Sequence, residues 1–190
     1  MKRSDRQGKR FMLPRGTDVF LRQLRVVIEG VVAACIICAA EKTVFSSIDL
    51  PFLNPAAPSV SLAFVIAVGF LMGKTEGGVC GLFTGFLCEG ASESGLFIYP
   101  LIYFVCGYLS GVAVDKILSH NLPSFMIHIA VGAAFLSVGE TARLAFEINT
   151  LPVGILASSI LPRALLTLIF AIPTYLLILL YVNLRMREKR

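Results

Sequence analysis

The stretch that most limits how this chain can fold runs from Gly69 to Gly111 and reads GFLMGKTEGGVCGLFTGFLCEGASESGLFIYPLIYFVCGYLSG. It is apolar, it is interrupted by only two short polar segments, and glycine recurs at every fourth position from Gly69 to Gly85. In a water-exposed helix each interior glycine costs about 1 kcal/mol relative to alanine. In lipid the same spacing lets helix backbones approach closely and pack. The stretch therefore predicts the packing centre of a protein with several membrane-spanning helices.

Composition supports this class of protein. The chain has 190 residues, of which 56% are hydrophobic and 15% charged, and its mean hydropathy is +0.81. An ordinary soluble domain is about 25% charged. At about 20 residues per span, this length leaves room for about six helices and almost no extramembrane domain. We predict an all-α integral membrane protein, a compact Gly-rich bundle of about six transmembrane helices that occupies residues 26–184.

The apolar segments predict helices over residues 26–45, 59–73, 77–89, 96–118, 124–146 and 153–184. Lys74, Thr75 and Glu76 are expected to form a tight turn between the second and third helices. The third helix is only about 20 Å long at 1.5 Å per residue, whereas the hydrocarbon core is about 30 Å thick. It either crosses within a shell of neighbouring helices, lies where the bilayer is thinned, or does not cross fully. The first arrangement is favoured.

Basic residues set the expected orientation. Eight of the 17 Lys and Arg lie in residues 1–25, and four more lie in residues 185–190, so both segments are expected to be cytoplasmic and near anionic lipid. Six spans also place Lys74 and Lys116 on the inner side, while the outer loops carry no basic residue between the helix ends. Nucleic acid is a disfavoured partner for these basic segments, because no aromatic stacking set or folded basic domain accompanies them.

Charged residues within apolar helices are the first candidates for function, because they are costly unless paired. Glu140, Arg143 and Glu147 are spaced to share one face of the fifth helix, and Arg163 lies in the outer half of the sixth. Together they predict an intramembrane cluster of two acids and two bases. One interpretation is an ion or substrate site, and the other is an ion-pair latch between two helices. Because the charges balance, the latch is favoured.

Other chemistry is not indicated. The five cysteines lie in apolar stretches, and the Cys35-x-x-Cys38 pair has no second ligand pair near it, so neither a metal nor a disulfide scaffold is expected. No nucleophile elbow, phosphate-binding loop or acid–base carboxylate pair occurs. We expect a protein that is not an enzyme and that has no cofactor.

The segment GGVCGLFTGFLCEGASESGLFIYPLIYFVCGYLSG, residues 77–111, resembles the rod shape-determining protein MreD family. The matching features are a Gly-rich short helix ending in an acid, a Gly-rich outer turn and a helix with Gly-Tyr-x-x-Gly. The acid here is glutamate where the family more often has aspartate. With the small-residue face of the first helix, these positions are the candidate helix-packing or partner interface: Gly30, Ala34, Gly77, Gly81, Gly85, Glu89, Gly95, Gly107, Tyr108 and Gly111.

The resemblance implies a non-catalytic scaffold in the inner (cytoplasmic) membrane of a bacterium, part of the cell-elongation machinery. It implies binding to the bitopic protein MreC, and through it a link to the peptidoglycan polymerase RodA and its class B transpeptidase. The alternative is a substrate-binding S component of an energy-coupling-factor vitamin transporter, which is also small and about six-spanning. That alternative requires an outward-open pocket with convergent polar groups, and the outer loops offer no clear anchoring set.

Overall fold

The computed structural model describes residues 15–46, 58–90, 97–116, 121–148 and 153–187. These residues form six α-helices and no β-sheet, which confirms the all-α class and the number of helices. The helices are α1 (Arg15–Ser46), α2 (Val60–Met72), α3 (Lys74–Gly90), α4 (Ile98–Lys116), α5 (Leu122–Ile148) and α6 (Val153–Arg187).

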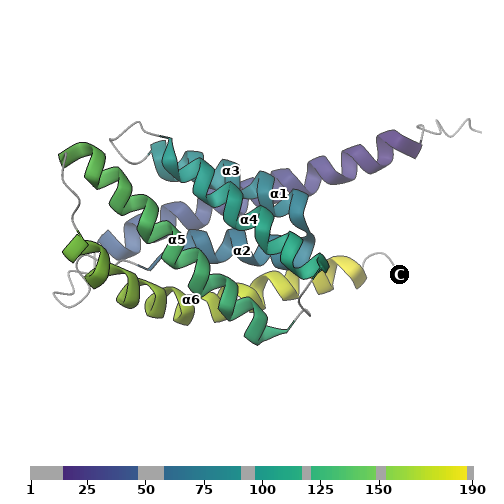
Figure 1. Cartoon of the computed structure of the whole chain (residues 1–190). Helices are drawn as coiled ribbons and strands as arrows, with labels where there is room; N and C mark the ends of the chain where they lie inside the picture. The colour runs from purple at the N-terminus through teal and green to yellow at the C-terminus, as the bar shows by residue number, and fades with distance from the viewer. Residues whose placement is uncertain (1–14, 47–57, 91–96, 117–120, 149–152, 188–190) are drawn as a thin grey trace, which may run out of the picture.

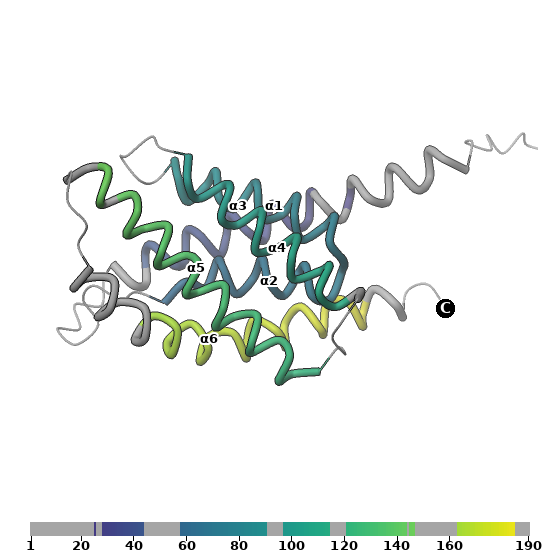
Figure 2. Tube along the Cα trace, viewed as in Figure 1, coloured from purple at the N-terminus to yellow at the C-terminus, as the bar shows by residue number. Residues whose placement is uncertain are grey.

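Helix α2 lies at the centre of the bundle. It contacts α1, α3, α4, α5 and α6, and in Figures 1 and 2 it runs across the middle, with α3 and α4 on one side and α6 on the other. Ten consecutive residues, 61–70, are buried around the whole circumference of this helix. A helix that is apolar on every face is stable only when its neighbours cover it, and α2 contains no charged residue.

Aromatic contacts join α2 to α5 and α6. The ring of Phe70 packs edge-on against Phe125 of α5 and Tyr175 of α6, with centroids 5.6 and 6.3 Å away. Phe125 and Tyr175 also contact each other at 4.7 Å. Phe70 and Phe125 are completely buried or nearly so. This cluster holds α5 and α6 against the side of α2 that α3 and α4 leave uncovered.

Two helices, α1 and α3, begin well before their expected first residues. Helix α1 begins at Arg15, eleven residues before the expected start at residue 26, and forms one continuous element as far as Ser46. Lys74, Thr75 and Glu76 do not form a turn but the first turn of α3. Gly73 alone reverses the chain, with φ 119° and ψ 170°, a conformation that essentially only glycine adopts. Helix α3 is therefore about 26 Å long and α2, at about 20 Å, is the short helix of the bundle.

The conformation of Gly73 gives a first prediction. Gly73→Ala should destabilise the protein by about 1–3 kcal/mol, because a side chain is strained at this φ and ψ whatever space surrounds it. Gly30→Ala is the control, since the added methyl group would lie 3.6 Å from the Cys80 sulfur, at ordinary contact distance. Thermal stability of the detergent-solubilised variants measures both effects. Equal stability of the two variants would contradict the assigned turn.

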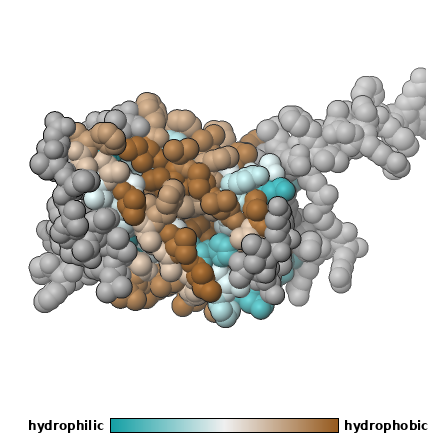
Figure 3. All heavy atoms as spheres, in the orientation of Figure 1, coloured by the Kyte–Doolittle hydropathy of each residue, from teal (hydrophilic) through white to brown (hydrophobic). Residues whose placement is uncertain are grey.

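Two helices of the described part of the chain are long and apolar enough to cross a membrane: Leu122–Arg143 in α5 and Arg163–Leu184 in α6. The apolar parts of α2 and α4 are shorter, at Val60–Met72 and Ile98–Val114. On the face that Figure 3 shows, apolar residues cover the middle of the bundle over α4, α5 and α6, and hydrophilic residues gather toward one end. Many large apolar side chains are exposed, as a lipid-facing surface requires.

Candidate functional site

The glycines of α2, α3 and α4 meet where these three helices cross. A methyl group added at Gly77 would lie 2.6 Å from the carbonyl oxygen of Gly107 and 2.9 Å from the nitrogen of Gly69. A methyl group at Gly107 would lie 2.8 Å from the carbonyl carbon of Gly77. Real Cβ atoms do not approach backbone this closely, so only glycine fits at these positions. The three backbones are in direct contact, as small-residue spacing in a membrane helix allows.

The same close approach continues along α3 and α4 in both directions. An added methyl group would lie 2.7 Å from the Tyr103 carbonyl carbon at Gly81, and 2.6 Å from the Pro100 nitrogen at Gly85. At Gly111 it would meet the carbonyl carbon of Gly73 at 2.8 Å. These glycines therefore pack helices of the protein against one another. We call them the glycine seam of α3 and α4: Gly77, Gly81, Gly85, Gly107 and Gly111.

The remaining interface candidates have different surroundings. Ala34 is fully buried, and the carbonyl of Gly30 accepts a weak hydrogen bond from the Cys80 thiol at 3.9 Å, so this face of α1 packs on α3. Tyr108 is 40% exposed and stacks on Phe104, with ring centroids 5.9 Å apart. Gly95 lies outside the described residues.

Two carboxylates, one half-buried and one buried, cap helices of the bundle. Glu41, near the end of α1, accepts hydrogen bonds from the backbone N–H of Ser61 at 2.8 Å and from its hydroxyl. Glu89, at the end of α3, is 4% exposed and accepts a hydrogen bond from the N–H of Tyr99 in the first turn of α4, at 3.2 Å. Each carboxylate satisfies a helix N-terminal donor and interacts favourably with the helix dipole.

Loss of a cap gives a second prediction. Glu41→Ala should destabilise the protein by about 1–2 kcal/mol, because the N–H and hydroxyl of Ser61 lose their acceptor in a buried site. Lys42→Ala is the matched control on the same turn, because Lys42 is exposed. Thermal unfolding in detergent compares the two. A smaller effect for Glu41→Ala than for Lys42→Ala would rule out the capping role.

The intramembrane charges predicted on α5 and α6 come together in part. Arg163, which is 9% exposed, forms an ion pair with Glu140, and Glu140 also accepts a hydrogen bond from the Tyr99 hydroxyl at 3.2 Å. The guanidinium of Arg143 lies over the Tyr99 ring, 5.7 Å from its centroid, a favourable cation–π geometry. The side chain of Glu147 lies outside the described residues.

Glu41 also belongs to this group, because its carboxylate interacts electrostatically with Arg163. The cluster was expected to contain acids only from the fifth helix, but the structure adds a carboxylate from α1. It also adds Tyr99, which joins α4 to the α5–α6 pair. The Glu140–Arg163 ion pair therefore joins α5 to α6, and the Tyr99 hydroxyl joins α4 to this pair.

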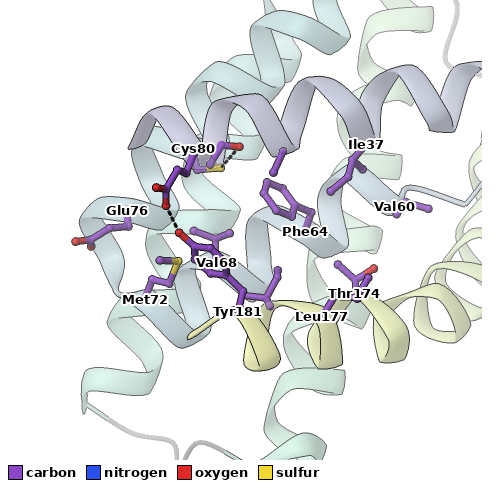
Figure 4. Close-up of a pocket in the computed structure, with 14 residues that line it drawn as sticks. Ile37, Val60, Phe64, Val68, Met72, Glu76, Cys80, Thr174, Leu177 and Tyr181 are labelled. Atoms are coloured by element: carbon purple, nitrogen blue, oxygen red, sulfur yellow. Dashed lines mark hydrogen bonds between the residues drawn. The ribbon is translucent and has the colours of Figure 1, made fainter. Parts of the chain in front are cut away.

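A groove opens between α1 and α6, on the opposite side of α2 from α4. Among the described residues the backbones of these two helices do not approach each other closely, and α2 forms the floor between them (Figure 4). The groove has a volume of about 340 Å³. Its residues are mainly apolar or small, and they include Gly30, Ala33 and Ile37 of α1, Phe64 and Val68 of α2, and Leu177 of α6.

One end of this groove is polar. There the Tyr181 hydroxyl of α6 donates a hydrogen bond to Glu29 of α1, which also accepts one from the Arg25 Nε–H at 2.7 Å. Glu76 of α3 lies at the same end, and Figure 4 shows its carboxylate pointing out of the groove. Sequence reasoning found the small-residue face of α1 but not the groove, because nothing in the sequence indicates that α1 and α6 stay apart.

A second, shallower groove of about 310 Å³ lies between α4 and α5, with Ile66 of α2 at its floor. It has no carboxylate in its lining. The described residues contain no group of three or more His, Cys, Asp or Glu side chains positioned to hold a metal ion. The candidate functional site is therefore the α1–α6 groove, which is apolar along most of its length and acidic at one end.

Comparisons with known proteins add no assignment, since no protein-family model, curated protein or solved structure matches this chain.

Proposed function

We propose that this protein is a non-catalytic scaffold subunit of the bacterial cell-elongation machinery, located in the cytoplasmic (inner) membrane. In this proposal it binds MreC and helps to organise peptidoglycan synthesis by RodA and its class B transpeptidase. The bundle crosses the bilayer six times, with both ends in the cytoplasm. The order of six helices and the contact between Tyr181 of α6 and Glu29 of α1 support that topology, because the contact brings the last part of α6 to the first half of α1.

The observation that carries the proposal is that the charged groups contact other helices of the bundle, whereas the groove that stays open is apolar. The buried and half-buried charged groups cap helices or join them to one another, as Glu41, Glu89 and the Glu140–Arg163 pair do. The open surface of the groove is apolar instead. A subunit with that arrangement is suited to packing against another membrane helix, and the resemblance of residues 77–111 to MreD points to MreC as that partner.

Affinity purification tests the proposal. The tagged chain, co-expressed with MreC of the same organism, is extracted in mild detergent and its co-eluting proteins are identified by mass spectrometry. Recovery of MreC with RodA and the transpeptidase is expected. A matched tagged membrane protein of similar size and abundance serves as the control. Absence of MreC from the eluate at wild-type expression would overturn the scaffold proposal.

The second candidate is an S component of an energy-coupling-factor transporter. The observation that favours it is the concentration of charged side chains at the end of the bundle that holds Glu140, Arg143 and Arg163, where the proposed topology places the outer surface. The same purification distinguishes it, because an S component should co-elute with a pair of ATPases and a coupling membrane subunit.

A further inference from the structure

We infer that the α1–α6 groove binds a membrane-spanning helix of a partner protein, and that this helix carries lysine or arginine on its cytoplasmic flank. The inference rests on the proposed function and deepens it, since it names the surface that docks the bitopic partner.

The shape of the groove favours a helix. Its α1 edge is formed by Gly30 and Ala33, which keep that edge low, and its α6 wall carries Leu177, which is 67% exposed. Small residues on one edge allow a second helix to approach closely in lipid, and exposed leucine provides dispersion contact with it. From Glu29 to Ile37 the edge measures about 12 Å, which is about two turns of a docked helix.

The carboxylates at one end of the groove favour an occupant with basic residues. The apolar part ends at two carboxylates, at the end of the groove that the proposed topology places on the cytoplasmic side: Glu76, and Glu29, which is already paired with Arg25 and Tyr181. Glu76 makes no hydrogen bond or ion pair with the described residues, and its carboxylate points beyond the groove. Cytoplasmic flanks of membrane helices are enriched in lysine and arginine. Such a flank would pair with Glu76, whereas the groove lining offers no lysine or arginine to the phosphate of an anionic lipid.

The second groove shows what this selection requires. It is similar in volume and equally apolar, but its lining contains no acidic residue. A lipid chain can fill either groove, while a helix with a basic flank is complementary only to the one between α1 and α6. The docking site is therefore assigned to the α1–α6 groove.

Photo-crosslinking tests the inference with two neighbouring leucines of α6. Benzoylphenylalanine replaces either Leu177, which lines the groove, or Leu176, which is 55% exposed and does not. Both proteins are co-expressed with full-length MreC in native membranes and irradiated. We expect a crosslink to the membrane-spanning segment of MreC from position 177, at least five-fold stronger than from position 176. Crosslinks to lipid alone from position 177, or equal MreC crosslinks from both positions, would overturn the inference.

Charge and packing variants provide the second measurement. Glu76→Lys should lower MreC recovery at least five-fold, while Thr75→Lys, at an exposed neighbouring position outside the groove, should not. Ala33→Phe should act like Glu76→Lys, and Val32→Phe, on the 54% exposed lipid-facing side of α1, is its control. If wild type recovers MreC and all four variants do too, the groove assignment fails while the scaffold proposal stands. If wild type recovers no MreC, both fail.

Discussion

Replacing Gly77 by leucine is expected to leave almost no monodisperse protein after detergent extraction, and Gly77→Ala is expected to cost about 3 kcal/mol. Overpacking of a close-packed core typically costs 1–3 kcal/mol, and more where the neighbours cannot move. At Gly77 the neighbours are the backbones of Gly69 and Gly107 rather than flexible side chains, so accommodating even a methyl group requires moving α2 or α4. Fluorescence-detected size-exclusion chromatography after a temperature series measures the loss.

Gly90→Ala is the control for this prediction. Gly90 ends the same helix, and nothing lies within 4 Å of the methyl group that the substitution adds. Alanine also has the higher helix propensity, so this variant should match or slightly exceed the wild type in stability. Comparable losses from Gly77→Ala and Gly90→Ala would show that the three backbones are not in contact. Gly85→Leu should resemble Gly77→Leu, because Gly85 faces the backbone of Pro100.

Breaking the ion pair between α5 and α6 should have the second-largest effect. Arg163→Leu is expected to destabilise the protein by about 3 kcal/mol, the lower end of the range for a buried pair, because it leaves the half-buried carboxylate of Glu140 without its partner cation. The double variant Glu140→Leu/Arg163→Leu should recover at least half of this loss, because replacing both charges by apolar groups removes the desolvation cost. Thermal stability of the two single variants and the double variant forms a double-mutant cycle.

An exposed ion pair supplies the comparison. Arg25 and Glu29 also form an ion pair, but the Arg25 side chain is 77% exposed, against 11% for Arg163. Arg25→Leu should therefore change stability by at most about 1 kcal/mol. Strict additivity of Glu140→Leu and Arg163→Leu in the cycle would mean that the pair does not act as a latch, whatever the size of each single effect.

The class of fold and the number of helices were predictable because they follow from composition and from the length of apolar segments. The close packing of α3 on α4 was indicated by glycine at four-residue spacing, which acts through local geometry. The central position of α2 was missed, although its sequence carries the signal: VSLAFVIAVGFLM has no polar face to present to water. The four-residue spacing of glycine instead placed the expected packing centre in residues 69–111, which follow most of α2.

The candidate site was less predictable, for physical reasons. Glu89 was predicted as an interface residue and Glu41 was not singled out, but each accepts hydrogen bonds at the N-terminus of a helix that begins later in the chain. Such contacts depend on how helices pack, which spacing within one helix does not encode. The groove was less predictable still, because it depends on the relative positions of three helices: α2 lies between α1 and α6 and keeps their backbones apart.

The burial of α2 also has a consequence for how the protein is made. The backbone N–H of Ser59, at the start of α2, donates a hydrogen bond to the hydroxyl of Thr167 in α6, and both residues are buried. Helix α2 therefore leaves the ribosome more than a hundred residues before this acceptor is made, and α2 alone is too short to span a hydrocarbon core. In the proposed six-span topology, stable insertion of the second helix requires the last one, so nascent chains cut short before α6 are expected to be substrates for membrane quality-control proteases.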